Sequence, residues 1–568
     1  MKRSSLRLYG PFLAIAAVQA LFIVVAPSKP AGQQLSTTQA GINQGRTGGS
    51  ATGAAAAGTT FDAAGNPVST GGGGSAGGAV DGPGGTAGGV AGPAAAAGGD
   101  VSHCVGEYQF DILINHGPPC VPKWPAGADN GGTTYQGVTA ESVKIIIFSS
   151  IPNEQVNQIL GAKGLATTEE QDAEFYEAAF AFIHQHYEFY GRKLDIKRIQ
   201  GDCPTTPPDY DACFAAAQEV LEERPFMVVW ATPLYADVME VWARNGIVTV
   251  GGWHFDDSYF NKPEVRGLRY DVFMDGTQSA DFISEYYCKK MAGQPADHAG
   301  TLIHPTIGTR STTRHLGIVV PEIPANKSTA DRVAAAVGQC EGRSIPVFTY
   351  ESNIETAVTQ TQNTVSGLID AGVTTVVCMC DPIAPVFATK GMTGNGYYPE
   401  ILLPGLGLLD YDLLGQLYDR EQMIHAFGPS HLQKLVPLGE TDAARVWRDQ
   451  GHTGHPCGNN GCGIHWGYTS FIATAIQMAG PNLHPATMEQ GILSLPPSGL
   501  GNPLSALVKF GPNDYTALSD VKEVYWDPNA TTPTDGSQGA FIPLNDAKRY
   551  QLGELPANGL ARIPVADH

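Results

Sequence analysis

Two successive runs of alternating strand-like and helix-like segments constrain the fold of this chain more than any other feature. In the first run, the continuous apolar segment 143–148 has the character of a buried strand. Apolar residues then repeat with a period of 3.6 across 171–190, as in an amphipathic helix. The alternation continues with predicted strands at 194–199, 226–231 and 247–250 and predicted helices at 214–224 and 234–245. Strands that alternate with helices predict βαβ units and a parallel sheet covered on both faces.

The same alternation begins again near residue 315. Predicted strands cover 315–321, 345–350, 374–380 and 398–404, and predicted helices cover 328–338 and 354–371. Each run is long enough to enclose its own core, so the expected fold class is α/β, with two Rossmann-like lobes of parallel sheet joined by a hinge. Because open α/β sheets bind ligands at the carboxyl ends of their strands, two facing lobes predict a ligand cleft between them.

The first hundred residues cannot contribute to such a core. A basic cluster at residues 2–7 precedes an apolar run at 9–27, which is the order of an export signal. The run is barely long enough to span a membrane and no typical cleavage site follows it, so residues 1–30 are expected to be a signal peptide or a membrane anchor. Residues 31–100 are rich in Gly and Ala and are expected to form a disordered tether. The predicted location is extracytoplasmic, either anchored or secreted.

The charge balance excludes one class of partner. The chain has 34 Lys and Arg against 55 Asp and Glu, a formal net charge of -21. Nucleic-acid binding needs a basic surface, and no basic segment of this kind is present in the sequence, so no nucleic-acid partner is expected.

The ten cysteines of an exported chain predict disulfides rather than metal or catalytic sites. Close spacing in the sequence favours three pairs: Cys104 with Cys120, Cys203 with Cys213, and Cys457 with Cys462. Spacing alone does not pair the other four, Cys288, Cys340, Cys378 and Cys380. On a strand, however, Cys378 and Cys380 would point to the same face.

The segment 452–465 reads HTGHPCGNNGCGIH and contains the residue types of a zinc site. The four residues between Cys457 and Cys462 are Gly and Asn, which form turns readily. A small disulfide loop is therefore favoured over a metal site, and no metal or other cofactor is expected.

Candidate ligand contacts in the first lobe follow two predicted strands. Thr232 and Tyr235 lie where a buried strand turns into a helix, so backbone N–H groups and a hydroxyl could bind a carboxylate or amide oxygen there. The alternative is that Thr232 only caps the helix and Tyr235 only packs in the core. Trp253 and His254 follow two glycines at the end of the next strand and could form an aromatic wall, although Trp253 could equally pack between the lobes.

In the second lobe, Glu322 and Asp381 follow two of the predicted strands. Either carboxylate could hold the ammonium group of a solute, because a buried charge needs a partner. The alternative is a role as a helix cap or a hinge residue. No nucleophile elbow, zinc-protease helix or Walker loop is present in the sequence, so no enzymatic activity is expected.

Five segments together resemble the branched-chain-amino-acid-binding type of ABC transporter substrate-binding proteins, which belong to the type 1 periplasmic binding proteins. The similar segments read GVTAESVKI from 137, VVWATPLYADVMEVWARNGIVTV from 228, YDVFMDGTQSADFISEYY from 270, GYTSFIATAIQMAG from 467 and VKEVYWDPNA to AKRYQLGELP over 521–556. The resemblance implies two hinged lobes with three crossovers, which close on a small solute and offer it to an ABC permease.

With this resemblance, the expected organisation is a disulfide-containing extension at 101–136, lobe 1 at 137–276 and lobe 2 at 277–425. The chain then returns to lobe 1 over 426–505 and to lobe 2, with a C-terminal tail, over 506–568.

Amino-acid binders of the family tend to carry an acidic residue in the loop after the third strand of the second lobe, whereas residues 383–387 of this chain, IAPVF, have none beyond Asp381. The solute could therefore be an amino acid, an amide or an organic acid. The alternative function is a membrane-tethered ligand sensor or surface interaction protein with the same fold.

Overall fold

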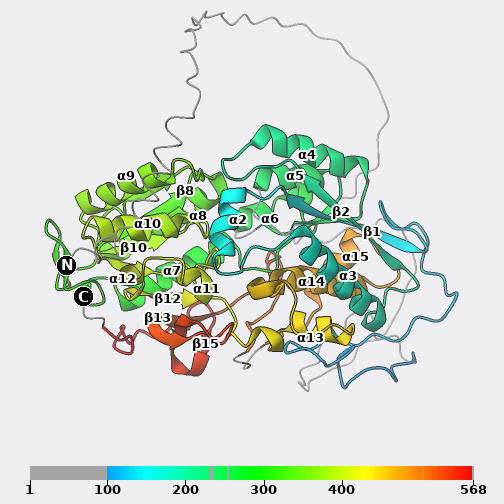
Figure 1. Ribbon diagram of the computed structural model, residues 1–568. Helices are drawn as coiled ribbons and strands as arrows, with labels where there is room; N and C mark the ends of the chain where they lie inside the picture. Colours follow the sequence, from blue (N-terminus) through cyan, green and yellow to red (C-terminus); the bar gives the residue numbers. More distant parts are fainter. Residues whose placement is uncertain (1–98, 231–234, 253–254, 500–501, 503, 566–568) are drawn as a thin grey trace, which may run out of the picture. The chain divides into compact units, whose positions relative to one another are not determined.

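The structure is a computed structural model that describes residues 99–230, 235–252, 255–499, 502 and 504–565 (Figure 1). These residues lie within one compact unit of the chain. The predicted signal or anchor (1–30) and all but the end of the predicted tether (31–100) lie outside the described residues. Among the residues that are described, no helix has the length and apolar character needed to cross a membrane.

The first lobe is built on a parallel sheet with the strand order β2-β1-β3-β4-β5. Its strands are β1 (Ser142–Ser150), β2 (Lys193–Gly201), β3 (Met227–Trp230), β4 (Val248–Val250) and β5 (Arg269–Tyr270). Ile145 and Ile146 of β1 are fully buried although they point to opposite faces, because helices cover both sides of the sheet. The continuous apolar run at 143–148 is therefore explained by the burial of both faces of β1.

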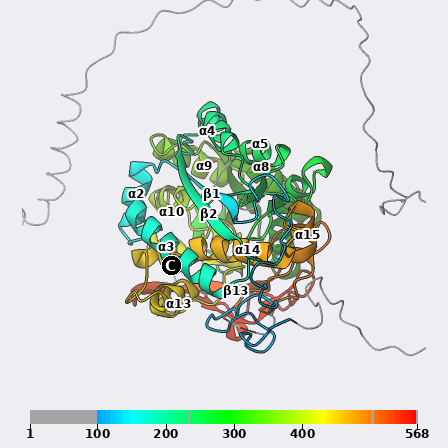
Figure 2. The ribbon, with the colours of Figure 1, turned by 90° about the vertical axis from the view of Figure 1, so that its right-hand side faces the viewer.

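Helices from two distant parts of the chain cover the first sheet. They are α3 (Glu169–His186), α4 (Tyr210–Glu222), α5 (Ala236–Arg244), α6 (Asp257–Phe260), α13 (Asp442–Asp449), α14 (Gly463–Ala479) and α15 (Pro485–Leu493). The α3 helix begins with a capping box between Thr168 and Gln171, which satisfies free backbone N–H groups of its first turn. The α14 helix packs against α3 (Figure 2), so the later segment completes the core of the first lobe.

The second lobe has a larger sheet with the order β14-β13-β12-β11-β10-β8-β9. The parallel strands are β8 (Leu316–Pro321), β9 (Val347–Tyr350), β10 (Thr375–Cys378), β11 (Glu400–Leu402) and β12 (Ala426–Ser430). The last strands, β13 (Val521–Thr531), β14 (Gln538–Pro543) and β15 (Arg549–Tyr550), pair antiparallel at one side. The sheet is therefore parallel where the sequence predicts βαβ units and antiparallel where the chain ends.

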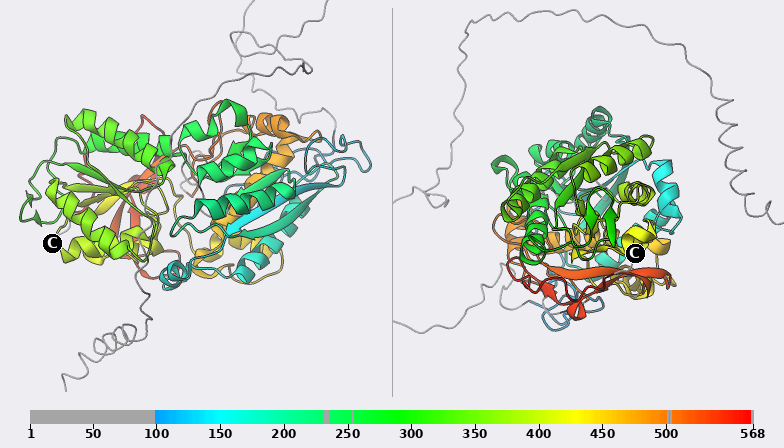
Figure 3. Two further views of the ribbon diagram at one scale, coloured as in Figure 1. Left: turned by 90° about the horizontal axis from the view of Figure 1, so that it is seen from above. Right: turned by 90° about the vertical axis from the view of Figure 1, so that its left-hand side faces the viewer.

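The helices of the second lobe are α7 (Gly276–Lys290), α8 (Pro324–Glu341), α9 (Ala357–Asp370), α10 (Ala384–Gly394), α11 (Asp412–Gly415) and α12 (Arg420–Met423). A short hairpin, β6 (Leu302–His304) with β7 (Gly308–Thr309), lies outside the main sheet. The α8 helix ends at Gly342 in the left-handed region, with φ of 71°, which a residue without a Cβ adopts without strain. Figure 3 shows the strands of each lobe between their own helices.

The described chain passes between the two sheets at three places. It leaves the first lobe between β5 and α7, returns between β12 and α13, and leaves again between Tyr515, which lies in the first core, and β13. The second and third crossings lie slightly later than the expected boundaries at 426 and 506. The reason is that β12 completes the parallel part of the second sheet, and residues 510–517 add to the first core, before the chain crosses.

Helix α2 (Glu154–Gly161) follows β1 in the sequence but packs against the second lobe, because Ile159 and Leu160 contact its core. Side chains then fix the loop after α2 on both sides. Lys163 Nζ donates to Gln416 Oε1 of the second lobe over 2.7 Å. Asn460 Nδ2, just before α14, donates to the Leu165 carbonyl oxygen over 3.0 Å. This segment therefore bridges the two lobes without being one of the crossings.

All ten cysteines are in disulfides. The pairs predicted from spacing are joined: Cys104 with Cys120, Cys203 with Cys213, and Cys457 with Cys462. The four cysteines that spacing did not pair form Cys288–Cys340, between α7 and α8, and Cys378–Cys380, at the end of β10.

Candidate binding cleft

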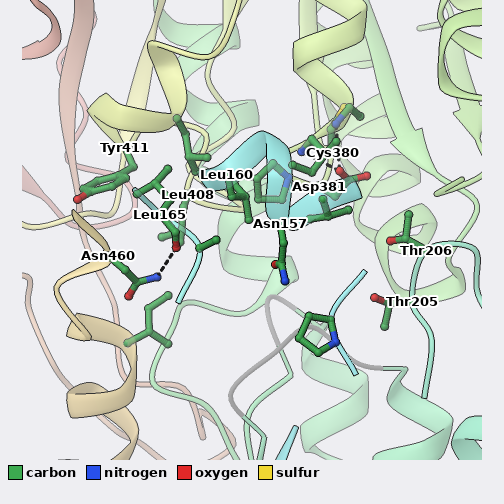
Figure 4. A pocket seen from close by; sticks show the side chains of 18 of the residues that line it. Asn157, Leu160, Leu165, Thr205, Thr206, Cys380, Asp381, Leu408, Tyr411 and Asn460 are labelled. Carbon is green, nitrogen blue, oxygen red and sulfur yellow. Dashed lines mark hydrogen bonds between the residues drawn. The ribbon is translucent and has the colours of Figure 1, made fainter. Parts of the chain in front are cut away.

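A cavity of about 780 Å³ lies between the lobes and is lined by residues from both (Figure 4). From the first lobe the lining includes the carboxyl ends of β1 and β2, and from the second lobe those of β8, β9 and β10. Helix α2 and the second crossing also contribute. The volume is within the range of cavities that hold small organic ligands, and the position agrees with the expected cleft at the strand ends.

The first wall of the cavity consists of Ser150 at the end of β1, Gln200 near the end of β2, and Thr205 in the loop that follows β2. The Ser150 hydroxyl is buried and has no hydrogen-bond partner among the described residues. A buried polar atom without a partner costs free energy, which a solute or a water molecule could recover by bonding to it. The first wall therefore offers neutral hydrogen-bonding groups to the cavity.

Helix α2 adds an amide to this side of the cavity. Asn153 caps the helix, since its Oδ1 accepts from the backbone N–H groups of Gln155 and Val156 at 2.9 and 3.1 Å. Its Nδ2 donates to the carbonyl oxygen of Thr206 over 2.8 Å, which ties α2 to the loop after β2. Asn157, one turn further along, lines the cavity between the two lobes (Figure 4).

The second wall consists of Tyr350 at the end of β9 and the segment 378–381 at the end of β10. The Tyr350 hydroxyl donates to Asp381 Oδ2 over 2.7 Å. Asp381 Oδ1 accepts from the backbone N–H groups of Ile383 and Ala384 at 2.9 and 3.0 Å, at the start of α10. Burial, followed by the adjacent Asp381 carboxylate, raises the pKa of Tyr350 well above its usual range. The Asp381 carboxylate thus lines the cavity but is already bonded to Tyr350 and to the backbone at the start of α10.

None of the other predicted contacts is placed in the cavity lining by the described residues. Glu322 is exposed and accepts a hydrogen bond from Thr349 Oγ1 over 2.8 Å; its neighbour Ile323, rather than Glu322 itself, lines the cavity. Tyr235 is buried in the core of the first lobe, with its ring centroid 4.2 Å from that of Tyr210. Thr232, Trp253 and His254 lie outside the described residues.

Most of the remaining lining is apolar. The apolar lining residues include Ile151, Val156, Leu160, Leu165, Val272, Phe273, Ile323, Ile354, Phe387, Leu408, Leu414, Leu435, Val436 and Ile464. Such a surface favours a solute with an apolar body, because burying that body removes its surface from water.

Charged side chains in the lining come mainly from β2 and α3. Arg198 Nη2 lies 3.9 Å from Glu169 Oε1, a separation at the limit of an ion pair. His465 Nε2 lies 3.7 Å from Asp172 Oδ1, and burial lowers the pKa of His465. Arg198 is therefore a lining cation with only a loose acidic partner.

The zinc site considered for residues 452–465 has no free cysteine ligands. Asp172 lies near the sulfur atoms of Cys457 and Cys462, but those sulfurs are bonded to each other and cannot act as thiolates. In the described chain, Asp297 and Glu400 form another possible ligand group, but both carboxylates already pair with Arg314, whose Nη2 donates to Glu400 Oε1 over 2.7 Å.

Two buried cations hold the second crossing to the third. Arg549 donates from Nη2 to the His431 carbonyl oxygen and from Nε to Asp520 Oδ1, each over 2.8 Å. Lys522 Nζ donates to the carbonyl oxygens of Leu432 and Gln433. Burial lowers the pKa of Lys522 to about 7.

No protein-family model matches this chain, and no curated protein is similar to it in sequence. Solved structures do match its fold. An ABC transporter substrate-binding protein from Aeropyrum pernix has 11% identity and a TM-score of 0.50, over 72% of this chain and 96% of that one.

Two further solved structures are similar. A fatty acid ABC transporter substrate-binding protein from Thermomonospora curvata has 13% identity and a TM-score of 0.49, over 76% of this chain and 99% of that one. A type 1 periplasmic binding protein from Bordetella pertussis Tohama I has 13% identity and a TM-score of 0.49, over 71% of this chain and 100% of that one. The chain therefore has a two-lobed α/β fold similar to that of the ABC transporter substrate-binding protein from Aeropyrum pernix.

Proposed function

We propose that this protein is an extracytoplasmic receptor that captures a small organic solute between its lobes and delivers it to the permease of an ABC transporter. The observation that carries the proposal is the cavity of about 780 Å³ at the carboxyl ends of strands from both sheets. Because three crossings connect the lobes, a change of angle at the crossings would bring the two walls together around a solute. The five disulfides support an oxidising compartment.

The chemistry of the lining favours an organic acid or an amide with a sizeable apolar body over a free amino acid. A free amino acid needs an anionic partner for its ammonium group. Among the lining carboxylates, Asp381 is already bonded to Tyr350 and to the start of α10. Glu169 and Asp172 lie beside Arg198 and His465, and Glu351 is exposed. Arg198, by contrast, is a cation whose closest acidic partner is 3.9 Å away, so it can bind a solute carboxylate. Ser150 and Asn157 can bond to neutral polar groups.

Thr232, Trp253 and His254 are proposed as further contacts. In the sequence they follow β3 and β4, and these two strands lie in the same parallel sheet as β1 and β2, whose carboxyl ends line the cavity. A Thr232→Ala change should then weaken solute binding while the protein remains folded, as titration calorimetry of the variant would measure.

The proposal is tested with purified protein and solutes that share one carbon skeleton but carry a carboxylate, an amide or an amino acid group. Thermal-shift measurements should show stabilisation by the acid or the amide, because a ligand present at 100 times its Kd stabilises the folded state by about 2.7 kcal/mol. Isothermal titration calorimetry then gives the affinity of each member.

The matched variants are Arg198→Gln in the cavity and Arg332→Gln on the surface of α8, where Arg332 pairs with Asp281. Only Arg198→Gln should weaken binding of the acid. If no member of a broad series stabilises the protein, or if both variants bind as the wild type does, the proposed receptor role of this cavity is wrong.

Delivery to a permease is tested in cells. Deletion of the gene should abolish uptake of the radiolabelled solute that binds in vitro, and the wild-type gene should restore it. Unchanged uptake, together with an altered transcriptional or signalling response to the solute, would instead support the tethered sensor.

A further inference from the structure

One of the five disulfides forms part of the cavity wall. Cys378 is the last residue of β10 and is paired with Val319 of β8, and Cys380 follows two residues later. Both residues line the cavity. Cys378 is partly exposed, whereas Cys380 is only 5% exposed and lies beside Asp381 in Figure 4. A molecule in the cavity can therefore reach this disulfide, of which Cys378 is the more exposed residue.

The other disulfides are placed differently. Cys203, Cys213 and Cys462 are 0% exposed and Cys457 is 6% exposed, and none of them lines the cavity among the described residues. Cys104–Cys120 lies in the N-terminal extension and Cys288–Cys340 joins α7 to α8 at the protein surface. Access through the cavity thus distinguishes Cys378–Cys380 from the other four.

The small ring that the Cys378–Cys380 disulfide closes also distinguishes it from the other four disulfides. A disulfide stabilises a fold mainly by restraining the unfolded chain, and the effect grows with the number of residues in the loop that it closes. Cys378 and Cys380 are separated by 2 positions, whereas Cys288 and Cys340 are separated by 52. The Cys378–Cys380 bond therefore contributes least to the restraint of the unfolded chain, and stability gives little reason for its presence.

We propose that Cys378–Cys380 is a thiol-exchange site, which a small-molecule thiol opens after entering the cavity. The thiolate attacks Cys378 Sγ and forms a mixed disulfide as the Cys378–Cys380 bond breaks. Cys380 leaves as a thiolate and takes up the proton that the attacking thiol has lost. A second thiol then attacks the mixed disulfide, so that two small thiols are oxidised to one small disulfide and the protein disulfide is reduced to two thiols.

The surroundings can accommodate the reduced form. Cys380 Sγ lies 3.7 Å from the carbonyl oxygen of Val319, which can accept the weak hydrogen bond of a thiol at this position. Asp381 follows directly and holds Tyr350 and the start of α10. Opening the ring removes a covalent restraint on this turn, so exchange at the disulfide acts on the second wall itself.

The first test maps which disulfides are reduced by limiting amounts of a small thiol, dithiothreitol, in the folded full-length protein. New thiols are trapped with iodoacetamide and located by peptide mass spectrometry. Cys378 and Cys380 should be labelled well before Cys203 and Cys213, which are buried away from the cavity. Labelling of Cys378 and Cys380 together with or after Cys203 and Cys213 overturns the proposal.

A bulky reductant sharpens this test. A thiol attached to a polymer too large to enter the cavity should still reduce Cys288–Cys340 at the surface. For each thiol, the rate of reduction of Cys378–Cys380 is divided by that of Cys288–Cys340. This ratio should be at least about tenfold lower for the polymer thiol than for the small thiol. Equal relative rates with both thiols would show that the exchange does not pass through the cavity and would overturn that part of the proposal.

A pair of single variants tests the direction of attack. Cys380→Ser leaves the partly exposed Cys378 as a free thiol, and Cys378→Ser leaves the buried Cys380. In the folded proteins, Cys378 should react with a small disulfide such as oxidised glutathione about tenfold faster than Cys380, because access limits the buried thiol. The reverse order contradicts attack at Cys378.

The double variants Cys378→Ser/Cys380→Ser and Cys288→Ser/Cys340→Ser control for folding. The first should lower the melting temperature less than the second, because it removes the smaller ring. A larger loss from the first would mean that the bond is mainly structural and would overturn the proposal.

Discussion

The two walls of the cavity use their polar side chains in opposite ways. On the second wall, Tyr350 and Asp381 are bonded to each other and to the start of α10, so their hydrogen-bonding capacity is used within the protein. On the first wall, the Ser150 hydroxyl is buried without a partner among the described residues. The difference indicates that the second wall is held in shape by its own polar groups, whereas the first wall keeps its polar groups for a solute.

The largest effect on the free energy of unfolding is expected at Asp275, in the first crossing between the lobes that carry the two walls. This residue caps α7 by accepting from the Gln278 N–H over 2.6 Å, and burial raises its pKa to about 7, with the carboxylates of Asp514 and Asp257 adding to the effect. A raised pKa makes the folded state hold the proton more tightly than the unfolded state. Its contribution to stability is therefore complete below about pH 4 and is lost as the pH rises to about 7.

Asp275→Asn keeps a capping side chain without the charge. Relative to the wild type, the variant should gain several kcal/mol of unfolding free energy at pH 7, at about 1.4 kcal/mol for each unit of pKa shift, and nothing at pH 4. Urea unfolding across this pH range gives the comparison. Parallel pH profiles for the two proteins would contradict the buried, protonated state of Asp275.

Removing the Asp381 carboxylate from the second wall should have the next largest effect on the free energy of unfolding. Asp381→Ala deletes the acceptor for Tyr350 and for two backbone N–H groups and should cost about 2 to 3 kcal/mol of unfolding free energy. Chemical denaturation measures it. A cost near zero would place Asp381 with the first wall, as a side chain kept for the solute.

Tyr350→Phe keeps the ring and removes two hydrogen bonds of the hydroxyl, which donates to Asp381 Oδ2 and accepts from the Asp381 N–H. The expected cost is about 1 to 2 kcal/mol of unfolding free energy, because the carboxylate keeps its two backbone partners. The melting temperature should fall less than in Asp381→Ala. An equal fall in both variants would mean that the tyrosine hydroxyl, rather than the cap, holds the second wall.

The smallest effect on stability is expected on the first wall. Ser150→Ala removes a hydroxyl with no partner among the described residues and should change the unfolding free energy by less than about 0.5 kcal/mol. The same change should weaken binding of the solute by about three- to tenfold, the value of one hydrogen bond. Titration calorimetry checks the affinity, and unchanged affinity combined with lower stability would reverse the assignment of the two walls.

The alternation of strands and helices could be predicted because each buried strand is a continuous apolar run and each helix has an apolar stripe. Helix α2 was not predicted, since its few apolar residues form no long stripe and its packing partners lie in the other lobe. The antiparallel strands β13 and β14 were not predicted as such either. Their pairing depends on where the chain enters the second sheet, which local sequence does not specify.

The site was predicted less completely than the fold. Ser150 lies at the end of β1 and Gln200 next to the end of β2, so the rule that selected Thr232 and Trp253 would also have selected them. Asp381 follows its strand as predicted, but only the positions of Tyr350 and the start of α10 show that its carboxylate is engaged. Tyr235 shows the reverse problem, because an aromatic residue near a strand end packs in the core or faces the cavity according to the path of the backbone.

The contacts of Arg549 and Lys522 have a consequence for domain motion. Both side chains come from the chain after the third crossing, and both bind carbonyl oxygens of residues 431–433 in the second crossing. Arg549 also binds Asp520, at the end of the third crossing. The second and third connections are therefore fastened to each other. Any rotation of one lobe against the other must carry these two connections as a single rigid strap. The first connection is joined to the third as well, because the Asp271 N–H donates to the Tyr515 carbonyl oxygen over 3.1 Å and the Ala517 N–H donates to the Asp271 carbonyl oxygen over 3.0 Å. The axis of rotation should therefore pass close to the strap.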